Sequence, residues 1–265
     1  TLSGYNAALF AAPPSINSQG VLTFTPAANA FGSTTVTVVL SDGALTVSHS
    51  FQINILALND APSFTAGADQ ATLEDAGAQT VSAWASNLSI GPDNEKPQTL
   101  TFHTANDNAA LFATAGQPTL QSNGTLTYTP ASNAFGTANV TVYLTDSGAS
   151  TGSNHNQRAS VVFRITVAPV NDQPTFVPGE DQQTLEDSGT QSVSGWASGL
   201  YAGAANEAEQ TYAFAVSNNQ PSLFGAEGQP AITPDGTLTY TPAVDAFGEA
   251  VVTVVLTDNG GTSNG

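Results

Sequence analysis

The chain contains no cysteine and no methionine, and it is almost devoid of basic residues. Without cysteine no disulfide can form, so core packing, together with any bound ions, must hold the fold. Lys96, Arg158 and Arg164 are the only basic residues against 21 acidic ones, and the formal net charge is −18. Phosphate groups are bound mainly by Lys and Arg, so this composition argues against nucleic acid and against anionic membranes as partners.

Two further absences bear on function. No apolar run approaches the ~20 residues that a membrane span requires, so no membrane insertion is expected. The three histidines, His49, His103 and His155, are at unrelated positions, and no HExxH, P-loop or dinucleotide-binding motif occurs. Carboxylates are numerous enough for a glycosidase pair, but their regular recurrence favours a structural role. The sequence therefore predicts a protein without enzymatic activity.

The chain is instead organised by an internal repeat. The segment NDAPSF at 59–64 returns as NDQPTF at 171–176, a spacing of 112 residues. Leu-Glu-Asp, Trp-Ala-Ser, Thr-Leu-Thr-Tyr-Thr-Pro and Ala-Phe-Gly return at the same spacing, and parts of an earlier copy precede them. Such self-similarity indicates a tandem array, and we interpret the chain as a window from a longer one. We expect the C-terminal part of a repeat at 1–57, a linker at 58–62, a complete repeat at 63–169, a linker at 170–174 and a repeat lacking its last strand at 175–265.

The pattern within a repeat indicates β-structure. Short segments that alternate apolar and polar residues are separated by Gly, Pro, Asn and Asp, and no stretch keeps a helical period beyond about two turns. Between 63 and 169 we expect seven such strands, which is typical of a Greek-key β-sandwich. The predicted fold class is therefore all-β, with tandem seven-stranded sandwiches in an elongated array.

The aromatic residues also recur once per repeat. Trp84 and Trp196 are best interpreted as core anchors beside the second strand of each sandwich, rather than as stacking platforms for a ligand. Phe135 and Phe247, in the Pro-Ala-x-x-Ala-Phe-Gly turn, are expected to close the end of the sandwich.

Acidic residues gather around the two linkers. Unpaired carboxylates repel one another, so a bound cation at a linker should stiffen it, and calcium takes six to eight oxygen ligands. A purely structural interpretation remains open, in which Asn-Asp makes a turn, Pro rigidifies the linker and Glu74 caps a loop. Most other acids are expected to keep a secreted protein soluble.

The order of the motifs resembles a known family. The segments are Asn59-Asp60-Ala61-Pro62, Glu74-Asp75-Ala76-Gly77, Gly91-Pro92-Asp93-Asn94-Glu95, Thr127-Tyr128-Thr129-Pro130 and Thr145-Asp146-Ser147-Gly148. They are similar to the cadherin-like tandem repeats of bacterial surface proteins and of large secreted, RTX-type adhesins. The resemblance covers the whole chain, and it implies cadherin- or immunoglobulin-like sandwiches with Ca²⁺ between consecutive repeats.

The resemblance also implies two sets of ligands. At the second junction they are Glu74, Asp75, Asn171, Asp172, Glu207 and Asp258. At the first junction they are Asn59, Asp60, Glu95 and Asp146, with Asp93 as a further candidate. Asn-Glu stands where animal cadherins have paired Asp, and Pro-Ala-x-x-Ala-Phe-Gly replaces their Leu-Asp-Arg-Glu. Fewer carboxylates imply weaker binding or fewer ions at each junction.

These expectations define a function. We expect an extracellular, secreted or cell-surface, non-catalytic region: a calcium-stiffened spacer of a bacterial adhesin or surface filament, with neighbouring repeats as partners. The alternative is a binding module whose repeats contact surface glycans or self-associate with identical copies. Its sequence support is the Ser-, Gly- and Asn-rich segment 147–157, a predicted long loop with His155 at its tip.

Overall fold

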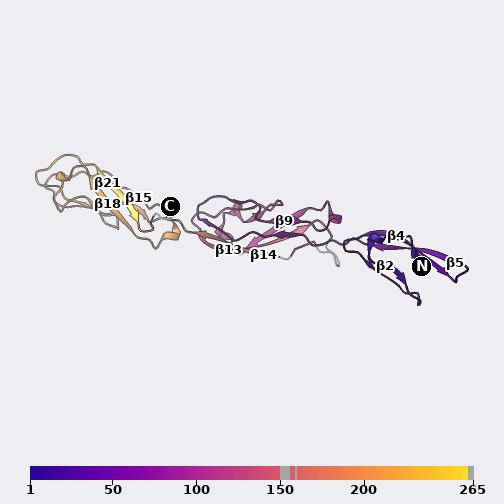
Figure 1. Ribbon diagram of the computed structural model, residues 1–265. Helices are drawn as coiled ribbons and strands as arrows, with labels where there is room; N and C mark the ends of the chain where they lie inside the picture. The colour runs from indigo at the N-terminus through magenta and orange to yellow at the C-terminus, as the bar shows by residue number, and fades with distance from the viewer. Residues whose placement is uncertain (150–155, 159, 262–265) are drawn as a thin grey trace.

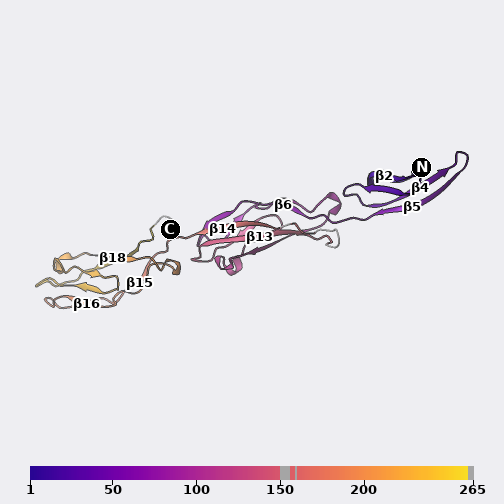
Figure 2. The ribbon, with the colours of Figure 1, turned by 90° about the horizontal axis from the view of Figure 1, so that it is seen from below.

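The computed structural model describes residues 1–149, 156–158 and 160–261, and it is built from β-strands with six three-residue 3-10 turns in this part of the chain. The β-units follow one another in a row, and the array is elongated in two perpendicular views (Figures 1 and 2). Of the predicted loop 147–157, residues 150–155, including His155, lie outside the described residues. Within the described residues, no helix is long and apolar enough to cross a membrane.

The first unit consists of β1 (Leu2–Ser3), β2 (Phe10–Ile16), β3 (Leu22–Pro26), β4 (Gly32–Ser41) and β5 (Thr46–Ile55), with the turn η1 (Ala7–Leu9). β4 and β5 form an antiparallel hairpin around Asp42-Gly43. Asp42 Oδ1 accepts hydrogen bonds from the N–H groups of Ala44 and Leu45, and Gly43 has φ 98°. A small core of its own contains Leu9, Phe10, Val36 and Ile53.

The middle unit is a complete sandwich. Its strands are β6 (Ser63–Thr65), β7 (Gln70–Leu73), β8 (Gln79–Val81), β9 (Ser86–Ser89), β10 (Leu100–Asn106), β11 (Thr119–Leu120), β12 (Leu126–Tyr128), β13 (Gly136–Asp146) and β14 (Val161–Ala168). Its turns are η2 (Asp93–Glu95), η3 (Ala109–Leu111) and η4 (Thr114–Gly116). One sheet has the order β10-β13-β14-β7, in which β7 runs parallel to β14, and a second has the order β11-β12-β8. β9 pairs with β6.

Both sheets contribute to one core. Along β13, alternate residues from Ala138 to Leu144 are buried while the intervening ones face outward, as the two-residue period of a strand requires. They pack with Phe163 and Ile165 of β14 and with Leu126 and Tyr128 of β12. The short strands β9 and β11 were not expected, because segments such as Ser-Asn-Leu-Ser carry too little alternation to be recognised.

The third unit repeats this order. Its strands are β15 (Thr175–Val177), β16 (Gln191–Val193), β17 (Ser198–Tyr201), β18 (Tyr212–Asn218), β19 (Ala231–Ile232), β20 (Leu238–Tyr240) and β21 (Val252–Asp258), with turns η5 (Ala205–Glu207) and η6 (Pro221–Leu223). β18 pairs with β21 over seven residue pairs, from Tyr212↔Asp258 to Asn218↔Val252. The all-β class and the tandem arrangement of sandwiches are therefore confirmed.

Trp84 is a core residue, as predicted. Its ring lies 4.2 Å from that of Phe163, measured between centroids, and its Nε1–H donates to the carbonyl of Ala68 over 2.9 Å. Trp196 makes the same kind of bond, to the carbonyl of Glu180 over 3.0 Å, but it is only half-buried.

The prediction that Phe135 and Phe247 plug the sandwich is wrong. Phe135 is 50% exposed and Phe247 is 86% exposed. The turn presents the preceding residue, Ala134, to the core instead. Phe31, in the equivalent turn of the first unit, is exposed as well.

We predict that Trp84→Ala lowers the free energy of unfolding by about 3–5 kcal/mol, because the cavity left by the ring cannot collapse against both sheets. Urea unfolding followed by circular dichroism measures the change. Trp196→Ala is the matched comparison, and its loss should be smaller because that ring is partly solvated. Equal losses would contradict the assignment of Trp84 as the main anchor.

Candidate metal centre

Each Asn-Asp linker is held by a glutamate from the repeat that follows. The peptide N–H of Asp60 donates to Glu95 Oε1 over 2.5 Å, and that of Asp172 donates to both carboxylate oxygens of Glu207 over 3.2 and 3.1 Å. Glu95 and Glu207 are buried. Both glutamates are placed by a 3-10 turn, η2 or η5, whose last residue is the glutamate itself.

The linker asparagine is bonded to the aspartate that ends the penultimate strand of a sandwich. Asn59 Nδ2 donates to Asp146 Oδ1 over 3.1 Å, and Asn171 Nδ2 donates to Asp258 Oδ1 over the same distance. The same aspartate oxygens accept from the N–H of Gly148 and Gly260, each over 2.8 Å. The structure thus brings together all four residues predicted for the first junction and their four equivalents at the second.

A glutamine three residues after each glutamate was missed by the sequence reasoning. Gln98 Nε2 donates to Asn59 Oδ1 over 2.6 Å. Gln210 Nε2 donates to Asn171 Oδ1 and to Glu207 Oε1, each over 2.9 Å. The signal was present in the sequence, since Asn-Glu-x-x-Gln recurs at the 112-residue spacing.

Glu74 reaches across the second junction. Its side chain is 1% exposed, and Oε1 accepts from the N–H of Val170 over 2.8 Å. Asn206 Nδ2, from the third unit, lies 3.0 and 3.2 Å from the two oxygens of Glu74. Asn206 is not among the predicted ligands, yet its side chain joins the third unit to the middle unit.

Asn133 provides a second contact across this junction, and it too was missed. Its N–H donates to Asp75 Oδ1 over 3.2 Å. In the amide orientation that satisfies its neighbours, its nitrogen lies 3.1 Å from Asp75 Oδ2 and 3.2 Å from Asp172 Oδ2. The pKa of Asp172 is raised by burial and by the nearby charges of Glu207 and Asp75. Negative charges from both units therefore converge on Asp172.

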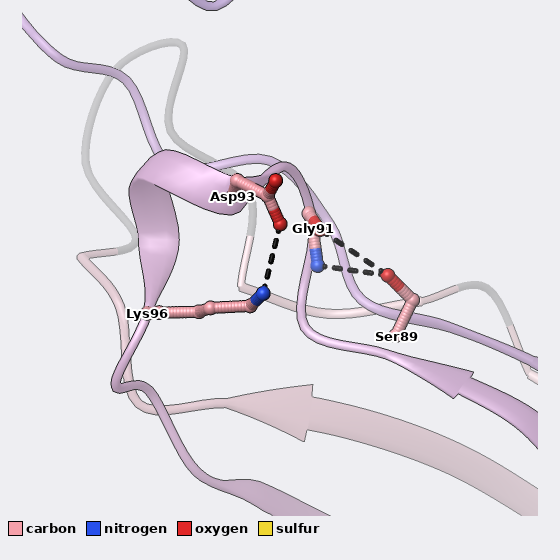
Figure 3. A network of polar contacts seen from close by, with 4 residues as sticks. All are labelled: Ser89, Gly91, Asp93 and Lys96. Atoms are coloured by element: carbon pink, nitrogen blue, oxygen red, sulfur yellow. Dashed lines mark hydrogen bonds and ion pairs between the residues drawn. The ribbon is translucent and has the colours of Figure 1, made fainter.

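Asp93, the additional candidate at the first junction, faces away from it. Its carboxylate pairs with Lys96 Nζ over 2.9 Å, and its side chain is 95% exposed. Figure 3 shows this ion pair closing the turn next to Gly91, whose N–H donates to the hydroxyl of Ser89 over 3.2 Å. Lys96 lowers the pKa of Asp93 through a hydrogen bond and through its charge.

Several buried oxygens at the junctions have no hydrogen-bond partner among the residues that the structure describes. At the first junction they are Asn94 Oδ1, Glu95 Oε2, Gln98 Oε1 and Asp146 Oδ2; at the second they are Asn206 Oδ1 and Gln210 Oε1. A buried acceptor left unsatisfied costs about 1–3 kcal/mol. All six are oxygens of the kind that calcium binds, from carboxylates and from amides.

The donor set is mixed rather than purely acidic. In the part of the chain that the structure describes, no three His, Cys, Asp or Glu side chains are arranged as a metal site. The oxygens that gather at the junctions come instead from amides interleaved with carboxylates. Such a set fits a hard cation that accepts neutral oxygen ligands at flexible geometry, which is the preference of Ca²⁺.

Comparison with known proteins supports the repeat assignment. Residues 59–156 match the model of a family described as bacterial Ig domain. A search of curated proteins found no match. The matched segment runs from the first linker into the predicted loop 147–157 and holds most of the middle unit, and its motifs return in the third unit.

The solved structures that resemble the chain include animal cadherin fragments. Mouse protocadherin-24 EC1-3 is 13% identical, with 97% of this chain and 88% of that chain covered and a TM-score of 0.43. Human protocadherin-24 EC1-2 is 16% identical, with 63% and 80% covered and a TM-score of 0.39. Human CDH23 EC21-23 is 13% identical, with 90% and 78% covered and a TM-score of 0.37.

Close packing around Glu207 predicts that Gly203 cannot be replaced by a larger residue without loss of stability. A Cβ at position 203 would overlap with Glu207 Oε2, whereas a Cβ at Gly225 would have 3.9 Å to its nearest neighbour. We expect Gly203→Ala to destabilise the third unit by about 1–3 kcal/mol in urea unfolding, because Glu207 must move off the linker. Gly225→Ala should be neutral or slightly stabilising, and a similar loss in both variants would contradict this account.

Proposed function

We propose that the chain is a non-catalytic, extracellular spacer of a bacterial adhesin or surface filament, stiffened by Ca²⁺ at the junctions between its repeats. The observation that carries the proposal is the pair of buried, unpartnered carboxylate oxygens, Glu95 Oε2 and Asp146 Oδ2, beside the first linker. Two buried carboxylates with no cationic side chain bonded to them are unfavourable unless a cation compensates them. The bacterial Ig match to the middle unit supports the bacterial origin.

The residues that hold the ion follow from the contacts at each junction. Asn59, Asp60, Glu95 and Asp146 form the first set. Glu74, Asp75, Asn171, Asp172, Glu207 and Asp258 form the second set. The amide oxygens of Asn94, Gln98, Asn206 and Gln210 complete them. These groups fix the linker and would supply the oxygen ligands, and Ca²⁺ would supply the positive charge that compensates the carboxylates.

Stiffening is the mechanical consequence. Repulsion among Asp75, Asp172 and Glu207 favours separation of the middle and third units, whereas the Glu74–Asn206 and Asn133–Asp172 contacts favour docking. A cation removes the repulsion and leaves the docking contacts. In this proposal the linkers are 58–62 and 170–174, and they separate sandwiches at 1–57, 63–169 and 175–265.

The neighbouring repeats are the proposed partners, in an array of the RTX-adhesin type that serves attachment or biofilm formation. Surface glycans are the second class of partner, because an open groove with an exposed aromatic ring lies at the second junction. Both roles require secretion or attachment at the cell surface.

We predict that Ca²⁺ raises the melting temperature and straightens the chain. At a free concentration 100 times the Kd, one bound ion stabilises the folded state by about 2.7 kcal/mol. Calorimetry and small-angle scattering in calcium and in excess EGTA measure both effects. Identical melting and scattering curves in the two buffers would contradict the proposal that the junctions bind Ca²⁺.

At the first junction, the contribution of Glu95 to calcium binding can be distinguished from that of Asp93, which lies in the same loop. Glu95→Gln should weaken calcium binding at this junction about tenfold or more, because it removes a buried charge that faces the linker. Asp93→Asn is the matched control, because its carboxylate is solvated and paired with Lys96. Isothermal titration calorimetry compares the two, and equal affinities in both variants would refute the assignment of Glu95.

A further inference from the structure

The second junction also carries a groove, which shares Asp172 with the proposed calcium ligands. This open groove of about 590 Å³ lies between the turn of the middle unit and the first strands of the third. Its lining includes Asn133, Asp172, Gln173, Thr175, Tyr201 and Ala205. Tyr201 ends β17 opposite Thr175 of β15, and it is 52% exposed. An aromatic ring thus stands at the edge of a polar groove.

The equivalent positions at the first junction carry different residues. Ser89 stands in place of Tyr201, Ala61 in place of Gln173, and Pro92-Asp93 in place of Ala204-Ala205. Figure 3 shows this loop in the middle unit, where Asp93 and Lys96 form an ion pair over its surface. The aromatic ring, the long amide and the two small residues are therefore particular to the second junction, although the Asn–Asp and Asp–Glu hydrogen bonds of the linker occur at both.

The chemistry of the groove selects a class of ligand. Binding sites for small molecules combine an aromatic surface with a few polar groups that fix orientation. A sugar ring presents an apolar C–H face to such a surface and hydroxyls at its rim, which the Gln173 amide and the Thr175 hydroxyl can pair. The groove lining contains one charged residue, Asp172, and no Lys or Arg that could pair with a sulfate or a carboxylate. The lining therefore favours neutral sugars over sulfated and uronic-acid sugars.

We propose that this groove binds a neutral carbohydrate, with Tyr201 as the platform for one sugar ring. The inference rests on the proposed function in one respect: the groove is formed by both units and needs them docked at the junction. Its position beside the linker means that a bound glycan chain crosses from the middle unit to the third. Adhesion would then occur along the array itself and not only at its end.

The experiment is a glycan array probed with the whole chain in calcium buffer. The array holds neutral plant, fungal and bacterial oligosaccharides together with sulfated and uronic-acid ones. The expected result is binding confined to neutral glycans, followed by titration calorimetry with the strongest of them. Tyr201→Ser, which installs the residue of the first junction, should weaken that binding about tenfold or more, because the stacking surface is lost.

Two variants make the result specific. Tyr201→Phe keeps the ring and should bind within about threefold of the wild type. Phe31→Ser removes an equally exposed ring from the first unit, 49% exposed, and should change nothing. Three results would each overturn the carbohydrate proposal: the chain binds no neutral glycan, it prefers acidic glycans, or Tyr201→Ser binds as well as the wild type.

The calcium response of the same preparations separates the two proposals. If the chain melts at a higher temperature in calcium but binds no glycan, the carbohydrate proposal is rejected and the calcium proposal stands. If the chain binds neutral glycans through Tyr201 but its melting temperature does not respond to calcium, the calcium proposal is rejected and the carbohydrate proposal stands. Unchanged circular dichroism of Tyr201→Ser excludes misfolding as the cause of lost binding.

Discussion

The arrangement of this chain depends on one hydrogen bond made twice, from a linker peptide N–H to a buried glutamate. Glu95 and Glu207 each accept the N–H of the linker aspartate, and so fix the point at which the chain enters a sandwich. The other contacts follow from it. A side chain at Gly91 or Gly203 would collide with that carboxylate, and the linker asparagine completes the ring of contacts by bonding the aspartate at the end of β13 or β21.

This solution has an electrostatic cost that Lys96 does not offset. Lys96 pairs with solvated Asp93, outside the junction, whereas the buried carboxylates accept hydrogen bonds from amide and peptide donors. Within the described residues, Glu95 Oε2 and Asp146 Oδ2 lack hydrogen-bond partners. In the proposal above, a cation from the medium compensates these carboxylates.

The fold was predictable because its determinants are local and repeated. Alternation along β13 indicates which residues are buried, and the spacing of Trp84 and Trp196 indicates an anchor. The direction of Phe135 was not predictable, because it depends on how the turn presents Ala134 to the core. The residues of the junctions were predictable only in part. Acidic residues near the linkers can be recognised in the sequence by their charge, whereas Asn133 and Gln98 are neutral. Asn133 also contacts Asp75, which is 58 residues away in the sequence. Whether these groups bind calcium stays a prediction.

The parallel pairing of β7 with β14 matters when the array is pulled. β7 lies near the start of the middle sandwich and β14 is its last strand, and they pair from Gln70↔Ile165 to Leu73↔Ala168. Tension applied to the two ends of the middle unit would draw these strands past each other, so their hydrogen bonds would be loaded together in shear and not broken one after another. The parallel pair therefore gives the middle sandwich a means of resisting force along its own axis.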